Sequence, residues 1–246
     1  FEIFRAFKVG WGKAVAVDEL EKKVLEVRAF EKNKGEVSKA RKRALSKINN
    51  AWTKKEILKA KGEALSLIDS VERDLEKDTL KVGLVGEFYL LLEPFANFDI
   101  EEFLGNRGIY LQKSVYLTDW LDSSGKNPVM GIPDEEIIEA ARPYLSHFVG
   151  GEGQATIGHM VKLAREGFDG IIHLLPFTCM PEIIAKSIYP RIVRDYDIPV
   201  LTLVIDEQTG KAGVQTRLEA FIDLMKERKK KGIKNEQLSW SGCRFS

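Results

Sequence analysis

The chain has few cysteines, no long apolar run and almost no net charge. Its 246 residues include two cysteines, Cys179 and Cys243, which are too few for a disulfide framework and form no C-x-x-C zinc motif. The 38 basic side chains nearly balance the 37 acidic ones, so the whole molecule has no electrostatic bias toward nucleic acid or a membrane. No apolar run approaches the roughly 18 to 20 residues of a membrane span. We therefore expect a cytoplasmic protein that binds neither nucleic acid nor a membrane.

The pattern of the sequence changes near residue 80. Before it, apolar residues recur at helical spacing, which predicts a helical segment over residues 1–79 that packs on or extends the main domain. Breaks are expected near Gly35 and at Asn49-Asn50, and Thr53 is placed to cap a further helix.

From residue 80 to 230, short apolar runs alternate with amphipathic segments of about ten to fifteen residues. This alternation is typical of crossover units, in which helices cover both faces of a parallel sheet. We expect a three-layer α/β domain of the flavodoxin or Rossmann type with a mainly parallel sheet of about four strands. Residues 231–246 are expected to form a loose tail and residues 123–133 a surface loop. The four expected strands are 79–86, 109–117, 169–177 and 198–205.

Cys179 follows the apolar run "GIIHLLPF" and precedes "MPEIIAKSI", which predicts a helix. In a parallel sheet, ligands bind beyond the carboxyl ends of the strands. A thiolate at a helix N-terminus is stabilised by free backbone N–H groups and the positive end of the helix dipole. The position suits a metal ligand or a reactive thiol. A small buried hydrophobe is an equally good interpretation, because free cysteine is among the most buried residue types.

Other residues at strand ends are expected on the same edge. Acidic side chains and glycines follow the first strand, precede the helix near 154 and follow the last strand. Glycine allows close approach of the backbone, although turn formation alone also explains it. The predicted binding residues are Gly86, Glu87, Gly151, Glu152, Glu182, Asp206 and Glu207, with Cys179 as metal ligand.

Two further features are expected to be structural. The three histidines lie on separate elements, and His173 falls inside an apolar strand. Eleven basic residues lie between Lys32 and Lys61 against two glutamates. They could attract phosphates, but nearly no aromatic residues are interleaved with them, so a solvated helix face is the favoured interpretation.

The motifs "VGLVGEFYLLLEPF", "GGEGQATIGHMVKLAREGFDGIIHLLPFTCMPE" and "DEQTGKAGVQTRLEAF" resemble the 2-hydroxyacyl-CoA dehydratase family in its wide sense. The similarity covers residues 80–226 and points to the activase-related and double-cubane cluster reductase-like members. It implies an iron-sulfur protein in which cysteines ligate a cubane-type cluster. It also implies an ATP-hydrolysing activase as partner and an acyl-CoA substrate, and Cys179 matches the family's cluster cysteine.

The chain departs from the family in its number of cysteines. A cubane needs about three or four protein ligands, and only Cys179 is well placed. The chain begins at Phe1, so we expect this sequence to be a C-terminal part of a longer protein whose N-terminal part carries the other cysteines. The cluster is expected to be incomplete or absent in this chain alone. The chain could also form a homo-oligomer. A non-catalytic interaction module and a thiol enzyme that uses Cys179 remain alternatives to the cluster-binding function.

Overall fold

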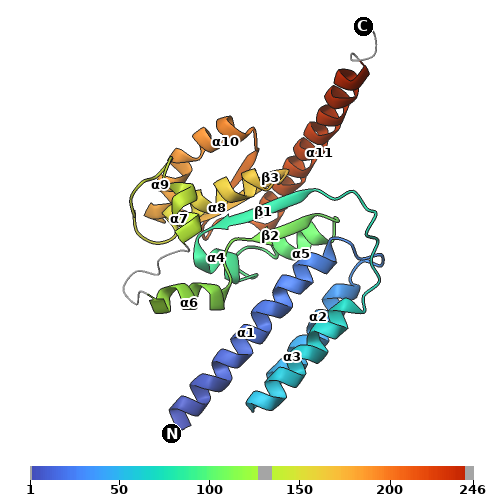
Figure 1. Cartoon of the computed structure of the whole chain (residues 1–246), viewed down its shortest axis with the longest axis vertical. Coiled ribbons are helices and arrows are strands. Elements are labelled where there is room, and N and C mark those ends of the chain that lie inside the picture. The colour runs from blue at the N-terminus through green and yellow to red at the C-terminus, as the bar shows by residue number, and fades with distance from the viewer. Residues whose placement is uncertain (1, 127–134, 242–246) are drawn as a thin grey trace.

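The computed structural model describes residues 2–126 and 135–241, and its centre is a four-stranded parallel sheet (Figure 1). The strand order is β2-β1-β3-β4, and every neighbouring pair is parallel. This arrangement confirms the predicted α/β class. The strands are β1 (Lys81–Gly86), β2 (Tyr110–Lys113), β3 (Gly170–Pro176) and β4 (Val200–Ile205).

Helices cover both faces of the sheet. One face packs against α4 (Phe88–Leu92), α5 (Ile100–Gly105) and α11 (Lys211–Ser241). The opposite face packs against α7 (Glu135–Ala141), α8 (Gly153–Arg165), α9 (Met180–Ile188) and α10 (Pro190–Tyr196). The strand side chains divide accordingly: Leu84 and Leu174 belong to the first core, and Val85 and Ile171 to the second. Successive side chains of a strand point to opposite faces, so continuous apolar strands supply both cores.

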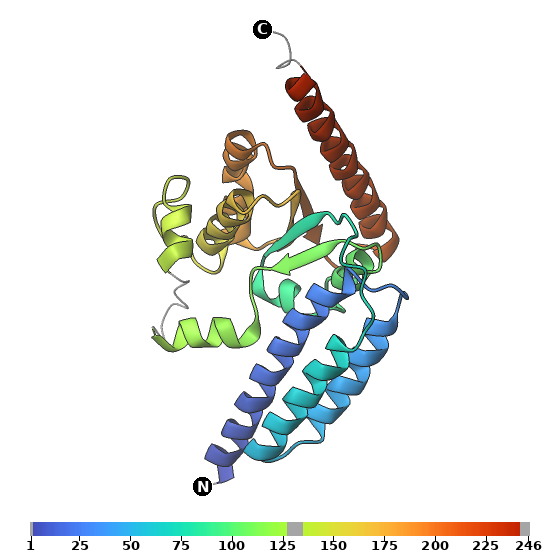
Figure 2. The same cartoon turned by 45° about the vertical axis from the view of Figure 1, so that its right-hand side comes forward.

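Before the sheet come three helices, α1 (Glu2–Arg28), α2 (Glu36–Asn49) and α3 (Lys54–Asp69). They form a bundle with its own apolar core, which extends away from the sheet (Figures 1 and 2). Thr53 caps α3 as expected: its side chain accepts a hydrogen bond from the Glu56 N–H, and the Glu56 carboxylate accepts one from the Thr53 N–H.

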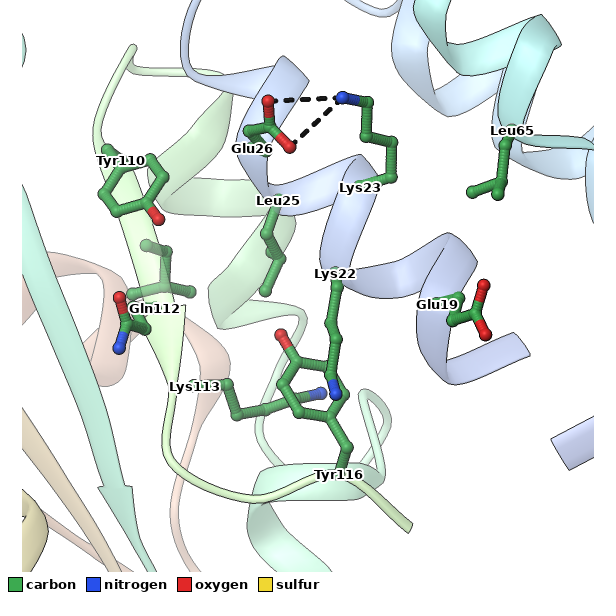
Figure 3. Close-up of a pocket in the computed structure, with 11 residues that line it drawn as sticks. Glu19, Lys22, Lys23, Leu25, Glu26, Leu65, Tyr110, Gln112, Lys113 and Tyr116 are labelled. Atoms are coloured by element: carbon green, nitrogen blue, oxygen red, sulfur yellow. Dashed lines mark hydrogen bonds and ion pairs between the residues drawn. The ribbon is translucent and has the colours of Figure 1, made fainter. Parts of the chain in front are cut away.

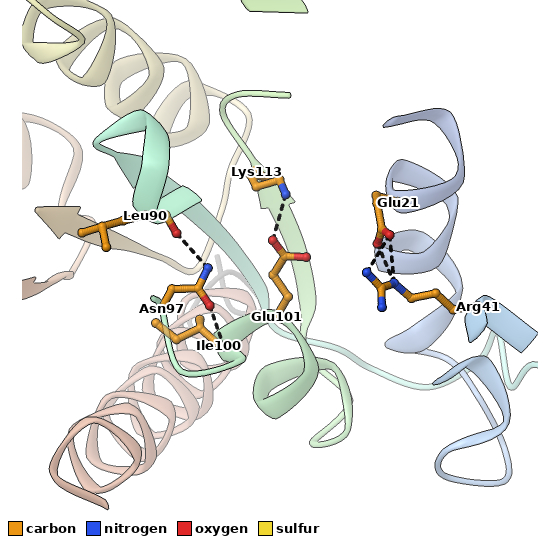
Figure 4. Close-up of polar contacts among 7 residues, drawn as sticks. All are labelled: Glu21, Arg41, Leu90, Asn97, Ile100, Glu101 and Lys113. Atoms are coloured by element: carbon orange, nitrogen blue, oxygen red, sulfur yellow. Dashed lines mark hydrogen bonds and ion pairs between the residues drawn. The ribbon is translucent and has the colours of Figure 1, made fainter. Parts of the chain in front are cut away.

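Polar contacts join this bundle to the α/β domain. The Asp18 carboxylate on α1 accepts hydrogen bonds from the backbone N–H and hydroxyl of Thr118, at 2.6 and 2.7 Å, in the first turn of α6 (Leu117–Lys126). Figure 4 shows two ion pairs in this region, Arg41 with Glu21 between the bundle helices and Lys113 with Glu101 between β2 and α5. The bundle therefore packs beside the β2 edge of the sheet.

Two boundaries in the structure differ from those expected from the sequence. Helix α11 continues to Ser241, so residues 231–241 extend a helix where a loose tail was expected, and residues 242–246, including Cys243, lie outside the described part. Of the expected loop at 123–133, residues 123–126 belong to α6, and the rest lies outside the described residues. Among the described residues, no helix is both long and apolar enough to cross a membrane.

Candidate functional site

The carboxyl ends of β1 and β3 form a topological switch point. The two strands are neighbours, and the chain continues from β1 into α4 on one face and from β3 into α9 on the other. In open parallel sheets, such a divergence leaves a crevice in which ligands bind. Glu87 and Cys179 follow these two strands, so the sequence places an acid and a thiol at this point.

Gly86 makes the close approach of β1 and β3 possible. Its φ angle is 133°, in the region that favours glycine, and a Cβ atom here would overlap the carbonyl oxygen of Leu174. The next N–H, from Glu87, donates to that same oxygen at 3.0 Å. The Glu87 carboxylate then accepts a hydrogen bond from the Leu90 N–H at 3.0 Å and caps α4. Glu87 thus has a local structural role at the site.

Cys179 is the N-cap residue of α9 and is partly exposed. Burial raises the pKa of its thiol, the nearby N–H of Glu182 opposes this rise, and the charges of Glu182 and Glu87 add to it. The expectation that the helix N-terminus would favour the thiolate is therefore wrong for this chain, because burial and two carboxylates outweigh the backbone.

Glu182 is completely buried in the first turn of α9, where it holds neighbouring elements together. One of its carboxylate oxygens lies 2.7 Å from Nε2 of His173 on β3, and the other accepts a hydrogen bond from the Thr156 hydroxyl on α8 at 3.0 Å. His173 also contacts the Tyr189 ring edge-on, with centroids 5.9 Å apart. Glu182 therefore fixes the first turn of α9, and with it Cys179, against β3 and α8.

The loop before α8 lies against the same turn. Gly151 and Gly153 pack on Pro181 so closely that a Cβ atom on Gly153 would overlap the Pro181 carbonyl oxygen. This contact places the loop that carries Glu152 against the first turn of α9. Burial raises the pKa of Glu152, a hydrogen bond from the Trp120 indole at 2.9 Å opposes the rise, and the charges of Glu182 and Glu87 add to it. Glu152 is thus a partly buried carboxyl that takes up a proton more readily than usual.

Asp206 and Glu207 stand apart in this arrangement. Both are exposed after β4, and the Asp206 carboxylate accepts hydrogen bonds from the Thr209 hydroxyl at 2.7 Å and the Gln208 N–H at 3.0 Å. These bonds lower the pKa of Asp206, the hydroxyl having the largest effect. The structure brings Gly86, Glu87, Gly151, Glu152, Cys179 and Glu182 together, while the described contacts of Asp206 lie within its own turn.

Three features of the site were not predicted from the sequence. They are the hydrogen bond of Thr156 to Glu182, that of Trp120 to Glu152, and the contact of His173 with Glu182. These contacts form when helices pack against the strand ends, and the spacing of residues in the sequence does not show this packing. A histidine within a continuous apolar strand was the one available signal, since a buried imidazole needs a polar partner. The sequence identified the histidine as structural but could not name the partner.

A separate pocket of about 560 Å³ lies between α1 and the edge strand β2 (Figure 3). Lys22 and Lys113 lie over the Tyr116 ring, 4.6 and 4.9 Å from its centroid. Lys22, Lys23 and Lys113 pair with Asp119, Glu26 and Glu101, at 2.8, 3.2 and 2.8 Å. With its lysines neutralised, this pocket offers little attraction for an anion.

No protein-family model and no curated protein matches this chain. Within the described ranges, no three or more His, Cys, Asp or Glu side chains form a group that could hold a metal ion. Cys179 is the single cysteine there. The described residues therefore supply one cysteine, fewer than the roughly three or four ligands that a cubane cluster needs.

Proposed function

We propose that this chain is part of an iron-sulfur reductase or 2-hydroxyacyl-CoA dehydratase-like protein, to which it contributes Cys179 as one thiolate ligand of a cubane-type cluster. The observation that supports the proposal is the position of Cys179 at the switch point between β1 and β3. Bound iron would replace the thiol proton, which offsets the raised pKa that the site imposes. An ATP-hydrolysing activase is the proposed partner and an acyl-CoA the proposed substrate.

The remaining ligands must come from outside the described residues, from Cys243, from further sequence or from another chain. The contacts of Glu182 position Cys179, and Glu152, whose pKa is raised, lies near Glu182 and Glu87 at the same strand ends. The surrounding carboxylates disfavour a free thiolate, so a thiol enzyme that uses Cys179 as nucleophile is the weaker interpretation.

The test is the content of iron and acid-labile sulfide in the complete protein or complex, purified without oxygen from its native cells. Several irons per chain that are lost in Cys179→Ala, but kept in the control Asp206→Asn, are the expected result. Absence of iron from the wild-type protein, even after reconstitution with iron and sulfide, would reject the proposal. Retention of the full iron content in Cys179→Ala would also reject it.

A non-catalytic interaction module is the second candidate function. It is favoured by a large apolar groove on the helical bundle, lined by Phe4, Phe7, Trp52 and Leu58 among others. Tight binding of the activase by a protein that holds reconstituted iron but shows no reductase activity would support this second function over the first.

A further inference from the structure

An apolar groove of about 990 Å³ lies between the N-terminal halves of α1 and α3. Four large apolar side chains beside it are mostly exposed, Phe4 at 75%, Phe7 at 69%, Trp52 at 67% and Leu58 at 55%. Figures 1 and 2 both show this end of the bundle pointing away from the sheet. A contiguous exposed patch of this kind is uncommon on a soluble domain and marks an interaction surface.

The groove is shaped by helix packing. Gly12 on α1 lies against Ile57 on α3, where an added Cβ atom would be 3.5 Å from the isoleucine side chain. Ile57 is the buried side chain in the groove lining. The exposed rings of Phe4 and Phe7 come from α1, and that of Trp52 from the residues just before α3. A cleft between two helices with an apolar floor accepts the apolar face of a third helix, with anchors at spacings of three and four residues.

The charged side chains that line the groove are all lysines: Lys8, Lys54 and Lys61. Lys13 lies next to them and places its ammonium group 4.0 Å from the centroid of the Trp52 ring. Among the described lining residues there is no acid. Lys61 has a partner in Glu19, at 2.9 Å. Glu56, which is close by, uses its carboxylate to accept the N–H groups of Trp52 and Thr53.

The helix dipoles strengthen this positive field. Both α1 and α3 begin at the same end of the bundle, so both positive dipole ends lie beside the groove (Figure 1). Lys54 and Lys55 occupy the first turn of α3, where a positive charge opposes the dipole. Lysines at this position lower the stability of the helix when nothing is bound, and an anion bound beside them removes this unfavourable interaction.

We infer that the groove between α1 and α3 binds an amphipathic helix of a partner protein, with an apolar face on Trp52, Leu58 and the phenylalanines and with acidic residues against Lys8 and Lys54. This inference goes beyond the proposed cluster and does not depend on it, because the groove lies on the bundle and Cys179 lies in the α/β domain, at the start of α9. A second copy of the chain and an anionic membrane are the competing occupants.

The test is a selection from displayed helical peptides of about 18 residues, long enough to form a helix. One face is drawn from apolar residues and the other positions from Glu, Lys and Gln. Selected peptides are then titrated against the whole chain by fluorescence anisotropy. Enriched peptides are expected to carry glutamates beside the apolar face. Equal enrichment of lysine-rich peptides, or no enrichment, would overturn the inference.

Three variants make the result specific. Leu58→Asp and Lys54→Glu are each expected to weaken binding about tenfold or more, whereas Leu75→Asp, at a leucine that is also exposed but lies outside the groove, retains it. Lys54→Glu places an acid in the first turn of α3, so its thermal stability is expected to be unchanged or higher and its loss of binding cannot reflect unfolding. Unchanged binding by both groove variants would contradict the inference.

The competing occupants are measured with the same variants. Sedimentation that shows a dimer abolished by Leu58→Asp, in a protein that binds no acidic peptide, would assign the groove to a second copy. Binding to vesicles that contain anionic lipid, without peptide binding, would assign it to a membrane. Either outcome rejects the acidic helix, and neither bears on the iron content that tests Cys179.

Discussion

Nε2 of His173 lies 2.7 Å from a carboxylate oxygen of Glu182, and both side chains are fully buried. The contact joins the middle of β3 to the first turn of α9, three residues beyond Cys179. The second Glu182 oxygen is bonded to Thr156 on α8. One side chain thus connects a strand and two helices at the place where the candidate ligand sits.

Removal of this connection is expected to destabilise the fold. Glu182→Ala leaves His173 and Thr156 without their buried partner, and we expect the free energy of unfolding to fall by about 1–3 kcal/mol for each group left unpaired. Glu182→Gln keeps part of the hydrogen bonding and should lose about 1–3 kcal/mol. Urea denaturation followed by circular dichroism measures both. The exposed Glu207→Gln is the matched control, and an Ala variant as stable as this control would show that the buried contact contributes nothing.

Cys179 is expected to react slowly with alkylating reagents at neutral pH. Since burial and the charges of Glu182 and Glu87 raise its pKa, the rate with iodoacetamide should reach half its maximum at a higher pH than for an ordinary thiol. Glu87→Gln removes one negative charge and should shift this midpoint to lower pH, while Gln can still cap α4. Mass spectrometry in a Cys243→Ser background isolates the signal. A midpoint that does not move in Glu87→Gln would remove this carboxylate as a cause.

The sequence predicted the sheet well because its signals are local and redundant. Each strand is a continuous apolar run. The capping box of α3 is formed by Thr53 and Glu56, which are only three positions apart in the sequence. The position of Cys179 followed from the same logic, since a thiol just after a buried strand must lie at its carboxyl end. The extent of α11 was missed because residues 231–241 contain a glycine and two serines and show no apolar stripe at helical spacing.

Side-chain partners could not be predicted in the same way. The Glu182 contacts join residues 9 and 26 positions away, and only the packed sheet brings them together. The pKa of Cys179 was misjudged for a related reason: the helix N-terminus is visible in the sequence, whereas burial and the approach of Glu87 from another strand are not. Local spacing locates the site, and tertiary packing decides its electrostatics.

Gly86 is expected to tolerate no side chain. Gly86→Ala must adopt a φ near 133° and would press its Cβ atom onto the Leu174 carbonyl, so strands β1 and β3 have to separate. We expect a loss of more than about 2 kcal/mol in the free energy of unfolding, or failure to fold. Gly62→Ala on α3, where an added Cβ meets open space, should instead stabilise by about 0.5–1 kcal/mol. Equal effects of the two substitutions in thermal denaturation would contradict this account.

Glu152 is expected to make the stability of the protein depend on pH in a particular direction. Burial raises the pKa of its carboxyl in the folded state, so between the ordinary and the raised value the folded protein binds more protons than the unfolded chain. The free energy of unfolding therefore falls as the pH rises through this window. Glu152→Gln stays neutral and still accepts the Trp120 hydrogen bond, so its stability relative to wild type should increase from about pH 4 to pH 7. Denaturation curves at several pH values measure this difference, with Glu207→Gln as the exposed control. A difference that stays constant across the range would mean that the Glu152 carboxyl titrates in the fold as it does in the unfolded chain.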